Sequence, residues 1–369
     1  MQGSKHLVDG SLLIIEALTR AGADVYIGYP ITPANLIYEY ARRRFPEFYA
    51  APDEISALQW AAGYAAIGKL PVAATSFPGL ALMVESINMF FMMELPLVLV
   101  LVQRLGPSTG SATVGADGDL LLLRGILSGG YTLPVFCPAD LTDCWTLSAA
   151  ALDAAANMRS PVILMTSKEM VMTSCSLNLA ALPQILPVKR SLSAAEGYSE
   201  PYAADENDAP PFLPVGNSLR RVRLNASTHD RSGLIRDNTP ESLANTQRLQ
   251  RKILHHMKSY DYFVWDAQDG SDLLLISYGV SALSTRAAAE ELRRRGGAVD
   301  LLMLQTLLPV PQEVIDGLDQ YRKIIIVEEN VTGALRQVLF GLSRDERIVS
   351  IGSIGRPISP SQIIREAGL

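Results

Sequence analysis

An acidic pair, Asp53-Glu54, opens a helix-forming stretch of small and apolar residues that runs from Ala57 to Gly68. A carboxylate in front of so apolar a helix is expected to be partly buried. Burying a charged carboxylate costs several kcal/mol unless the group is paired or hydrogen-bonded, so Glu54 indicates a compensating partner. The alternative is an ordinary acidic residue that the helix dipole favours in a first turn. The spacing alone leaves both interpretations open.

The elements that must position this pair alternate between strand and helix along residues 1–175. We expect strands at 24–29, 48–51, 72–76, 97–102 and 162–165, separated by helices at 10–21, 34–44, 54–68, 80–91 and 141–157. This alternation predicts an α/β fold with a doubly wound parallel sheet, whose ligands bind beyond the carboxyl ends of the strands. The polar segments that fall at such ends are Gly28 to Thr32, Asp53-Glu54, Ser76 to Gly79 and Gln103-Arg104.

The rest of the chain divides into two further parts. Residues 176–258 are rich in proline, acids and polar residues and end in a charged helix from Thr239 to Lys258. A connector of this length is usually functional or wraps a neighbour, and we expect this one to wrap a neighbour. From 259 to 369 the alternation returns, with strands at 273–278, 298–303, 323–327 and 348–351. This predicts a second, smaller α/β domain.

Composition narrows the class of protein. The 369 residues suffice for two or three domains, and 48% are hydrophobic against 19% charged, which fits either large α/β cores or surface hidden against other subunits. The net charge of −6, without a basic patch, argues against a nucleic-acid partner. The apolar run 95–102 is too short to span a bilayer, and the N-terminus has no apolar signal core, so no membrane association is expected.

Cysteine and histidine usage argues against a metal centre on this chain. Cys137, Cys144 and Cys175 are scattered, which indicates a reducing compartment, and we expect a cytoplasmic protein. Three such residues cannot hold an iron–sulfur cluster alone, since a cluster typically takes four closely spaced thiolates. The four histidines show no metal-ligand spacing.

Several motifs together resemble the α subunit of the 2-oxoacid:ferredoxin (acceptor) oxidoreductases, the family of the pyruvate, 2-oxoglutarate and 2-ketoisovalerate enzymes. The resemblance covers nearly the whole chain in the same order. Its first part lies in Gly28-Tyr-Pro-Ile-Thr-Pro33, Asp53-Glu54, Thr75-Ser-Phe-Pro-Gly79 and the run from Val102 to Gly110. It continues in Pro211 to Gly216 and Ser227 to Asp230, and then, for the transketolase C-terminal-like domain, in Ile276 to Gly279, Gln305 to Pro309 and Val327 to Asn330.

The resemblance implies an enzyme shared between chains. This chain would supply a pyrimidine-type thiamine-diphosphate domain (1–175) and the transketolase C-terminal-like domain (259–369), in a hetero-oligomer with two-fold symmetry. A β subunit would supply the diphosphate half with Mg²⁺ and, with any δ subunit, the iron–sulfur clusters; a γ subunit would be separate or absent. Consistent with this division, Ala116-Asp117-Gly118 and Gln268-Asp269-Gly270 come nearest to a diphosphate motif, and neither opens a plausible metal site.

The implied reaction is oxidative decarboxylation of a 2-oxoacid to acyl-coenzyme A and carbon dioxide, with electrons passing to ferredoxin. Glu54 matches the family's catalytic glutamate, which bonds the pyrimidine N1′ of thiamine diphosphate. Tyr29, Pro30 and Ile31 would bind the cofactor. A 2-oxoacid carboxylate must be held, and Arg104 suits this by a two-point contact; a surface salt bridge is its alternative.

Other residues of these motifs have less specific roles. Thr32 offers a rigidly placed hydroxyl for the substrate carboxylate or carbonyl, and its alternative is a turn residue that bonds its own backbone. Ser108, Thr109 and Gly110 would line the same pocket or contact the β subunit, unless they form a plain polar loop.

Two departures from the family pattern bear on the substrate. Leu105 and Phe77 stand where glycines are frequent, and they reduce the volume and polarity of the pocket. This puts 2-oxoglutarate in doubt and favours a branched, aryl or other apolar 2-oxoacid. Two other functions stay open: a non-redox thiamine-diphosphate decarboxylase or transketolase-like subunit, and a catalytically idle paralogue that acts as a scaffold.

Overall fold

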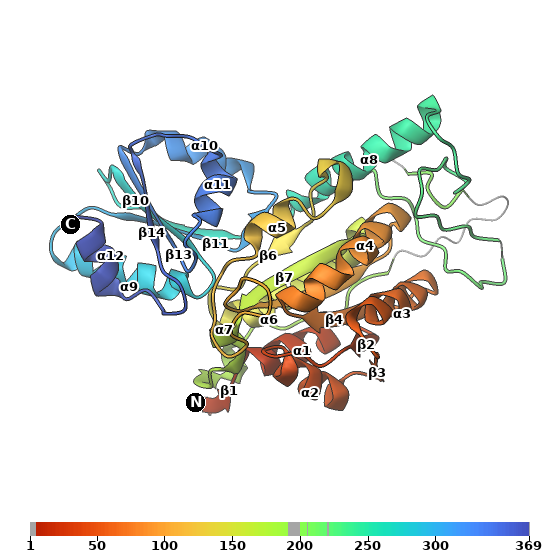
Figure 1. Cartoon of the computed structure of the whole chain (residues 1–369), viewed down its shortest axis with the longest axis horizontal. Coiled ribbons are helices and arrows are strands. Elements are labelled where there is room, and N and C mark those ends of the chain that lie inside the picture. The colour runs from red at the N-terminus through yellow and green to blue at the C-terminus, as the bar shows by residue number, and fades with distance from the viewer. Residues whose placement is uncertain (1–4, 191–199, 205, 220, 369) are drawn as a thin grey trace.

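Two α/β units lie side by side in the computed structural model, which describes residues 5–190, 200–204, 206–219 and 221–368 (Figure 1). Each unit is built around its own sheet. The parts of the predicted domains and connector that fall on residues 1–4, 191–199, 205, 220 and 369 lie outside the described residues.

The first unit holds a seven-stranded sheet. Its strands, in the order in which they lie, are β12 (Thr306–Leu308), β6 (Val135–Phe136), β7 (Pro161–Ser167), β5 (Leu97–Gln103), β4 (Pro71–Thr75), β2 (Val25–Gly28) and β3 (Glu47–Ala50). All neighbours pair in parallel except β12 and β6. Strands β2, β4, β5 and β7 are buried along their whole length, as is typical of parallel strands covered on both faces. The predicted doubly wound sheet is confirmed.

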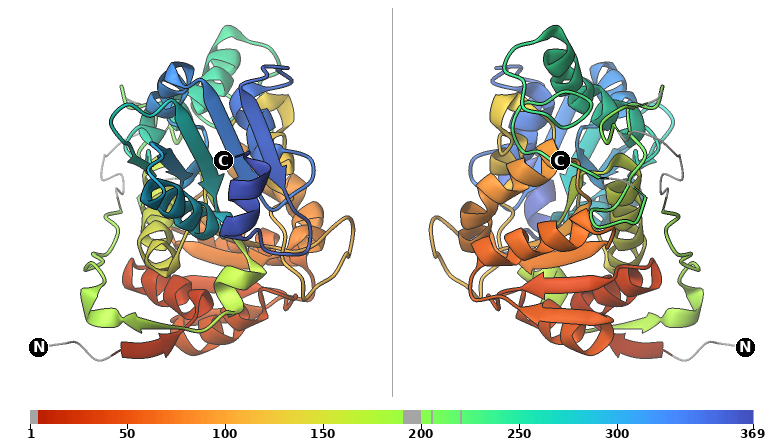
Figure 2. Two further views of the ribbon diagram at one scale, coloured as in Figure 1. Left: turned by 90° about the vertical axis from the view of Figure 1, so that its left-hand side faces the viewer. Right: turned by 90° about the vertical axis from the view of Figure 1, so that its right-hand side faces the viewer.

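Helices cover both faces of this sheet (Figure 2). One layer consists of α1 (Gly10–Arg20), α2 (Asn35–Arg44), α6 (Leu141–Met158) and α7 (Lys168–Met172), and the other contains α3 (Glu54–Ala66) and α4 (Phe77–Met93). Aspartates begin three of them: Asp9, Asp53 and Asp140 each accept a hydrogen bond from a backbone N–H in the first turn. Such caps satisfy donors that a helix start otherwise leaves unpaired.

The second unit holds a five-stranded sheet. Its strands, in spatial order, are β14 (Ile348–Gly352), β13 (Lys323–Glu328), β10 (Leu273–Tyr278), β11 (Asp300–Leu304) and β9 (Phe263–Asp266). The first four are parallel and β9 is antiparallel. Its helices are α9 (Ser281–Arg294), α10 (Gln312–Gly317), α11 (Ala334–Phe340) and α12 (Pro360–Glu366). This agrees with the smaller α/β unit that the sequence predicts.

One strand joins the two units. Strand β12 follows β11 of the second sheet directly along the chain, yet it pairs with β6 at the edge of the first sheet. Thr306 fixes this crossing, because its buried hydroxyl donates to the Tyr260 carbonyl and accepts from the Tyr262 N–H. A second unpredicted pairing, β1 (Lys5–Val8) with β8 (Cys175–Asn178), closes a small antiparallel sheet.

A buried charge cluster ties the described part of the connector to the first unit. The predicted helix at its end is confirmed as α8 (Pro240–Met257). Arg248 and Lys252 of this helix both pair with Glu94 at the end of α4, and all three are buried. Arg159, also buried, donates to the carbonyls of Pro201 and Pro210 and so holds the middle of the connector.

Candidate active site at the carboxyl edge of the first sheet

The predicted site residues follow four neighbouring strands, β5, β4, β2 and β3. Arg104 follows β5, Ser76 follows β4, Thr32 lies in the loop after β2, and Glu54 lies after β3. Because these strands are parallel, their carboxyl ends form one edge of the sheet, which is where open α/β sheets bind ligands.

Glu54 is the first residue of α3, and its side chain is 7% exposed. The neighbouring Asp53 provides the helix cap by accepting from the Ser56 N–H, so Glu54 is not needed for that purpose. Among the described residues, none donates a hydrogen bond to the Glu54 carboxylate. The predicted burial is confirmed, and the carboxylate is a nine-tenths-buried acceptor without a donor from this part of the chain.

A glycine makes room for this carboxylate. Gly79 lies in the first turn of α4, and a Cβ atom added there would come within 2.6 Å of Glu54 Oε1 and 2.1 Å of Thr75 Oγ1. Both distances are shorter than any tolerable contact. The Thr75-Ser-Phe-Pro-Gly79 segment therefore approaches Glu54 closely only because it ends in glycine.

Arg104 is also largely buried, with 7% of its surface exposed. Its Nη1 donates to the carbonyl of Thr32 at 2.6 Å, and its Nε has no partner among the described residues. Burial lowers the pKa of the guanidinium, and the nearby Asp119 charge opposes that shift. In the described part of the chain no carboxylate lies within ion-pair distance of Arg104, so the alternative of a surface salt bridge is wrong.

The remaining predicted residues are more exposed than Glu54 and Arg104. Tyr29 and Pro30 are exposed, and Ile31, Thr32 and Phe77 are half-buried. Thr32 meets Arg104 through its backbone carbonyl rather than through its hydroxyl.

The loop after Arg104 is shaped by a second close approach. Leu105 is half-buried and bridges to Ser111, whereas Ser108, Thr109 and Gly110 are exposed. A Cβ atom at Gly110 would lie 1.6 Å from the Leu105 carbonyl oxygen, so this turn requires glycine. The exposure of the loop favours contact with another chain over a place deep in the pocket.

Three buried polar residues beside Arg104 escaped the sequence interpretation. Gln103 donates from Nε2 to Asp117 Oδ1 at 3.2 Å and accepts from the Asp119 N–H at 3.0 Å. Both aspartates keep a buried Oδ2 that lacks a partner among the described residues. Burial raises the pKa of Asp119 to about 7 and that of Asp117 well above its ordinary value. The sequence offers one signal for them, two aspartates spaced two apart in the loop after β5, of which only Asp117 enters the prediction, as part of an incomplete diphosphate motif.

The second unit meets the first at Asp117. The Tyr278 hydroxyl, at the end of β10, and the Asn330 amide, just after β13, both donate to the Asp117 carbonyl. The Asp117 N–H donates to the carbonyl of Glu329, whose pKa burial raises to about 7. The loop between Arg104 and Asp119 thus contacts residues at the carboxyl ends of two strands of the second sheet.

Exposed apolar side chains lie on the helix that Glu54 begins and on its neighbour α4. Helix α3 exposes Ile55 in its first turn and Trp60 in its middle, and Ile67 is exposed just after its last residue. Helix α4 exposes Leu82. We refer to these four residues as the α3–α4 face. Helices α3 and α4 pack against each other, and α3 is apolar around most of its circumference, which is typical of a helix covered on all sides.

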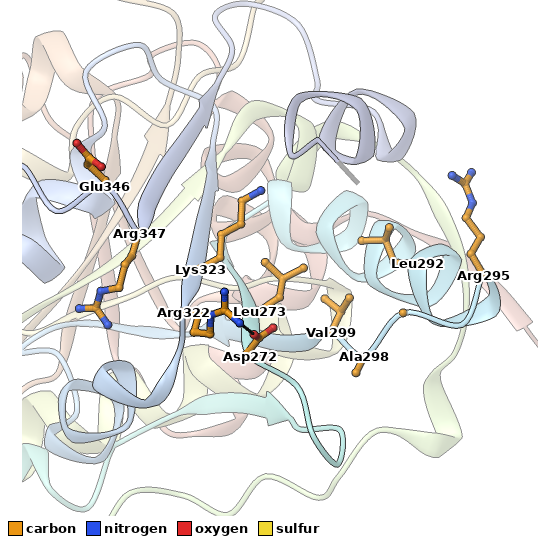
Figure 3. Close-up of a pocket in the computed structure, with 11 residues that line it drawn as sticks. Asp272, Leu273, Leu292, Arg295, Ala298, Val299, Arg322, Lys323, Glu346 and Arg347 are labelled. Carbon is orange, nitrogen blue, oxygen red and sulfur yellow. Dashed lines mark ion pairs between the residues drawn. The ribbon is translucent and has the colours of Figure 1, made fainter.

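A separate cavity in the second unit is a weaker candidate for the functional site. It has a volume of about 680 Å³ and lies at the amino ends of β10 and β13, the opposite end of that sheet from Asp117 (Figure 3). Two of its charged residues at the strand ends are already engaged: Arg322 pairs with Asp272, and Lys323 donates to the Ala367 carbonyl. No described group of histidine, cysteine and acidic side chains is arranged to hold a metal ion. Among the described helices, none is long and apolar enough to cross a membrane.

Sequence comparisons match both units to known families. Residues 16–248 match the family described as pyruvate flavodoxin/ferredoxin oxidoreductase, thiamine diphosphate-binding, and residues 264–369 match the transketolase C-terminal domain. The chain is 26% identical to the 2-oxoglutarate synthase subunit KorA of Methanocaldococcus jannaschii, over 100% of this chain and 98% of that one. It is 29% identical to the ketoisovalerate oxidoreductase subunit VorB of Methanothermobacter thermautotrophicus, over 90% and 88% of the two chains.

Comparison with solved structures supports the same fold. The 2-oxoglutarate:ferredoxin oxidoreductase from Magnetococcus marinus superimposes with a TM-score of 0.93 over 99% of this chain, at 24% sequence identity. The present chain spans 65% of that longer chain. At this identity the likeness establishes the arrangement of both units and leaves the chemistry to the site residues.

Proposed function

The chain belongs to the pyruvate flavodoxin/ferredoxin oxidoreductase family, and from this premise we propose that it is the α subunit of a thiamine-diphosphate-dependent 2-oxoacid:ferredoxin oxidoreductase. The resemblance inferred from the sequence motifs is confirmed by the family match, which covers residues 16–248. The proposed reaction is oxidative decarboxylation of a 2-oxoacid to acyl-coenzyme A and carbon dioxide, with electrons passing to ferredoxin.

The observation that carries the proposal is the state of Glu54. Its carboxylate is buried, has no donor among the described residues, and lies against a glycine that leaves space for it. A buried acceptor of this kind fits the ring N1′ of thiamine diphosphate, which presents a proton to a carboxylate. When bound, the cofactor supplies the thiazolium carbon that adds to the keto carbon of the substrate. Glu54 would hold the proton at N1′, while Tyr29, Pro30 and Ile31 would contact the pyrimidine.

Arg104 would bind the substrate carboxylate. Its Nη1 is engaged by the Thr32 carbonyl, which fixes the guanidinium, and its Nε is left for another acceptor. A charge-assisted hydrogen bond from a buried guanidinium to a carboxylate is strong and directional. The Thr32 hydroxyl would assist at the same end of the substrate. Phe77 and Leu105 would present apolar surface to its side chain, which favours a branched or aryl 2-oxoacid over 2-oxoglutarate.

A partner subunit would complete the site. The exposed apolar residues of the α3–α4 face lie on the helix that Glu54 begins and on the neighbouring α4, and they fit the buried part of a subunit interface. We propose that a β subunit covers this face, with Ser108, Thr109 and Gly110 at the same interface. Mg²⁺ and iron–sulfur clusters would reside on β and any δ subunit. With any γ subunit, the whole would be a cytoplasmic hetero-oligomer with two-fold symmetry.

The test is Glu54→Gln in the complex reconstituted with its partner subunits. We expect 2-oxoacid-dependent viologen reduction to fall by at least about 100-fold, because the amide cannot replace the carboxylate at N1′. Size-exclusion chromatography should show an intact complex. The matched control is Glu346→Gln, an exposed glutamate at the cavity of Figure 3, which should leave the rate unchanged. Near-normal rates in the Glu54 variant would refute the assigned role.

The same preparation separates the other two functions. A non-redox decarboxylase would release carbon dioxide from a 2-oxoacid without any electron acceptor. An idle scaffold would bind no thiamine diphosphate in calorimetric titration of the complex.

A further inference from the structure

We propose that Asp119 is a positioning residue that couples binding of the 2-oxoacid carboxylate at Arg104 to the uptake of one proton. The inference rests on the proposed function of Arg104 and adds to it. The step is a simple protonation: a proton from solvent adds to Oδ2 of Asp119 as the substrate carboxylate approaches the guanidinium.

The first argument is the unusual use of Asp119. It is the N-cap residue of α5 (Leu120–Arg124), a position where aspartate normally accepts a hydrogen bond from the helix. The Asp119 side chain makes no such bond. Instead its backbone N–H donates to Gln103 Oε1, and its Oδ2 is buried without a partner among the described residues. The carboxyl group is thus held in the interior with one oxygen available for a proton.

The second argument is the incomplete pairing with Arg104. The two side chains interact electrostatically, yet they lie beyond ion-pair distance, and each keeps an unpartnered atom, Nε and Oδ2 respectively. An arginine and an aspartate that are both buried normally meet directly, because an isolated buried charge is costly. The separation leaves the guanidinium free to bind a different carboxylate.

The third argument is the charge of the surroundings. Asp119 acts on Asp117, which in turn faces Glu169 of α7, Glu328 of β13 and Glu329. The cation that acts on Asp119 is Arg104. Burial already raises the pKa of Asp119 to about 7, and the attraction of Arg104 limits that rise.

Substrate binding changes this balance in one direction. A 2-oxoacid carboxylate on Arg104 partly neutralises the positive charge that stabilises ionised Asp119. It also adds a second negative charge close to Asp119. Both effects favour the protonated form of Asp119. Binding therefore draws in a proton when the free protein holds Asp119 ionised, which is the case above about pH 7. Affinity for the substrate should fall as the pH rises past that value.

The decisive experiment is calorimetric titration of the assembled complex with 2-oxoisovalerate at pH 8, without thiamine diphosphate, so that the acid binds but is not decarboxylated. Measuring the heat in phosphate and in Tris, which differ in ionisation enthalpy, gives the number of protons taken up. We expect close to one proton in the wild type and none in Asp119→Asn. In steady-state assays the KM of the wild type should rise about tenfold per pH unit above pH 7, and the KM of the variant should not depend on pH.

Asp140→Asn is the matched control. Asp140 is also an N-cap aspartate, but it makes the usual cap bond to the Asp143 N–H, which asparagine can preserve. This variant should keep the proton uptake and the activity of the wild type. A wild type that binds the 2-oxoacid without proton uptake, or an Asp119→Asn variant that keeps the uptake, would overturn the inference alone. A wild-type complex that binds no 2-oxoacid would overturn the proposed function itself. Because the wild-type measurement needs no variant, poor folding of Asp119→Asn cannot obscure the result.

Discussion

At the scale of single residues, the absence of one side chain at position 79 decides whether Glu54 can occupy its place. Gly79→Ala would put a methyl group against Glu54 Oε1 and Thr75 Oγ1 at distances too short for contact. We expect the full chain to lose about 1–3 kcal/mol of unfolding free energy through overpacking. The complex should bind thiamine diphosphate more weakly, because Glu54 is displaced. Urea denaturation and calorimetric titration measure the two effects.

Gly63→Ala is the natural control for that experiment. Gly63 lies in the interior of α3, where an added Cβ meets no other atom within 4 Å. Alanine should therefore leave the stability of the chain unchanged or raise it by up to about 1 kcal/mol. Equal losses in both variants would show that the contact with Glu54 is not the cause.

At the scale of elements, the packing of α8 on the end of α4 depends on one carboxylate. Glu94→Gln would leave Arg248 and Lys252 buried without their anion, and we expect a loss of about 3–5 kcal/mol in unfolding free energy. Arg251, exposed on the same helix, pairs with Asp208 of the connector and offers a control. Arg251→Met should change stability by less than about 0.5 kcal/mol. A mild effect of Glu94→Gln in urea denaturation would contradict this account.

The same carboxylate predicts how the cluster responds to acid. Burial raises the pKa of Glu94, but the charges of Lys252 and Arg248 outweigh it and lower the pKa to about 2. Because the folded pKa lies below the ordinary value of 4.5, the stabilisation is fully present above pH 4.5 and is lost as the pH falls towards 2. Denaturant midpoints measured from pH 5 to pH 3 should therefore fall more steeply for the wild type than for Glu94→Gln.

The elements that could be predicted from sequence are those with a local signal. The apolar run of β5 and the residues after it placed Arg104 at a strand end, and the acidic start of an apolar helix identified Glu54. Strands β6 and β12 were missed because they have only two and three residues and exist through pairing with distant segments. The pairing of β1 with β8 is non-local in the same way.

The site was predictable to a similar extent. The roles of Glu54 and Arg104 follow from their residue types and their positions at strand ends. The roles of Gln103 and Asp119 depend on which side chains the loop after β5 directs into the interior. That choice is made by tertiary contacts with the second sheet, above all at Asp117. No spacing within the loop encodes it.

At the scale of the whole molecule, the junction between the two units should weaken as the pH rises. Burial raises the pKa of Glu329 to about 7 and that of Asp117 well above normal, so the folded chain binds more protons than the unfolded chain near neutrality. Their contribution is fully present at low pH and is lost as the pH rises through about 7. Denaturation midpoints should be lower at pH 8 than at pH 6. Glu329→Gln should reduce that difference, and an unchanged difference would contradict the assignment.

The crossing of β12 predicts that the two units unfold together. Thr306→Val keeps the shape of the side chain but removes both hydrogen bonds to the 260–262 segment, and we expect a loss of about 1–3 kcal/mol. Differential scanning calorimetry should show one transition in the wild type and a lower, broader one in the variant. Thr142→Val, at an exposed position of α6, should leave the trace unchanged. Two separate transitions in the wild type would show that the units unfold independently.

The α3–α4 face also has a consequence for how the polypeptide must be made. Ile55, Trp60, Ile67 and Leu82 would stay in water on any copy released from the ribosome without something to cover them. Apolar patches on a lone folded chain promote self-association and retention by chaperones. Overproducing this polypeptide by itself should yield aggregates, whereas translating it alongside a binding chain in matched amounts should keep it dispersed. These four side chains therefore limit how much of the polypeptide can be made in excess of its binding chain.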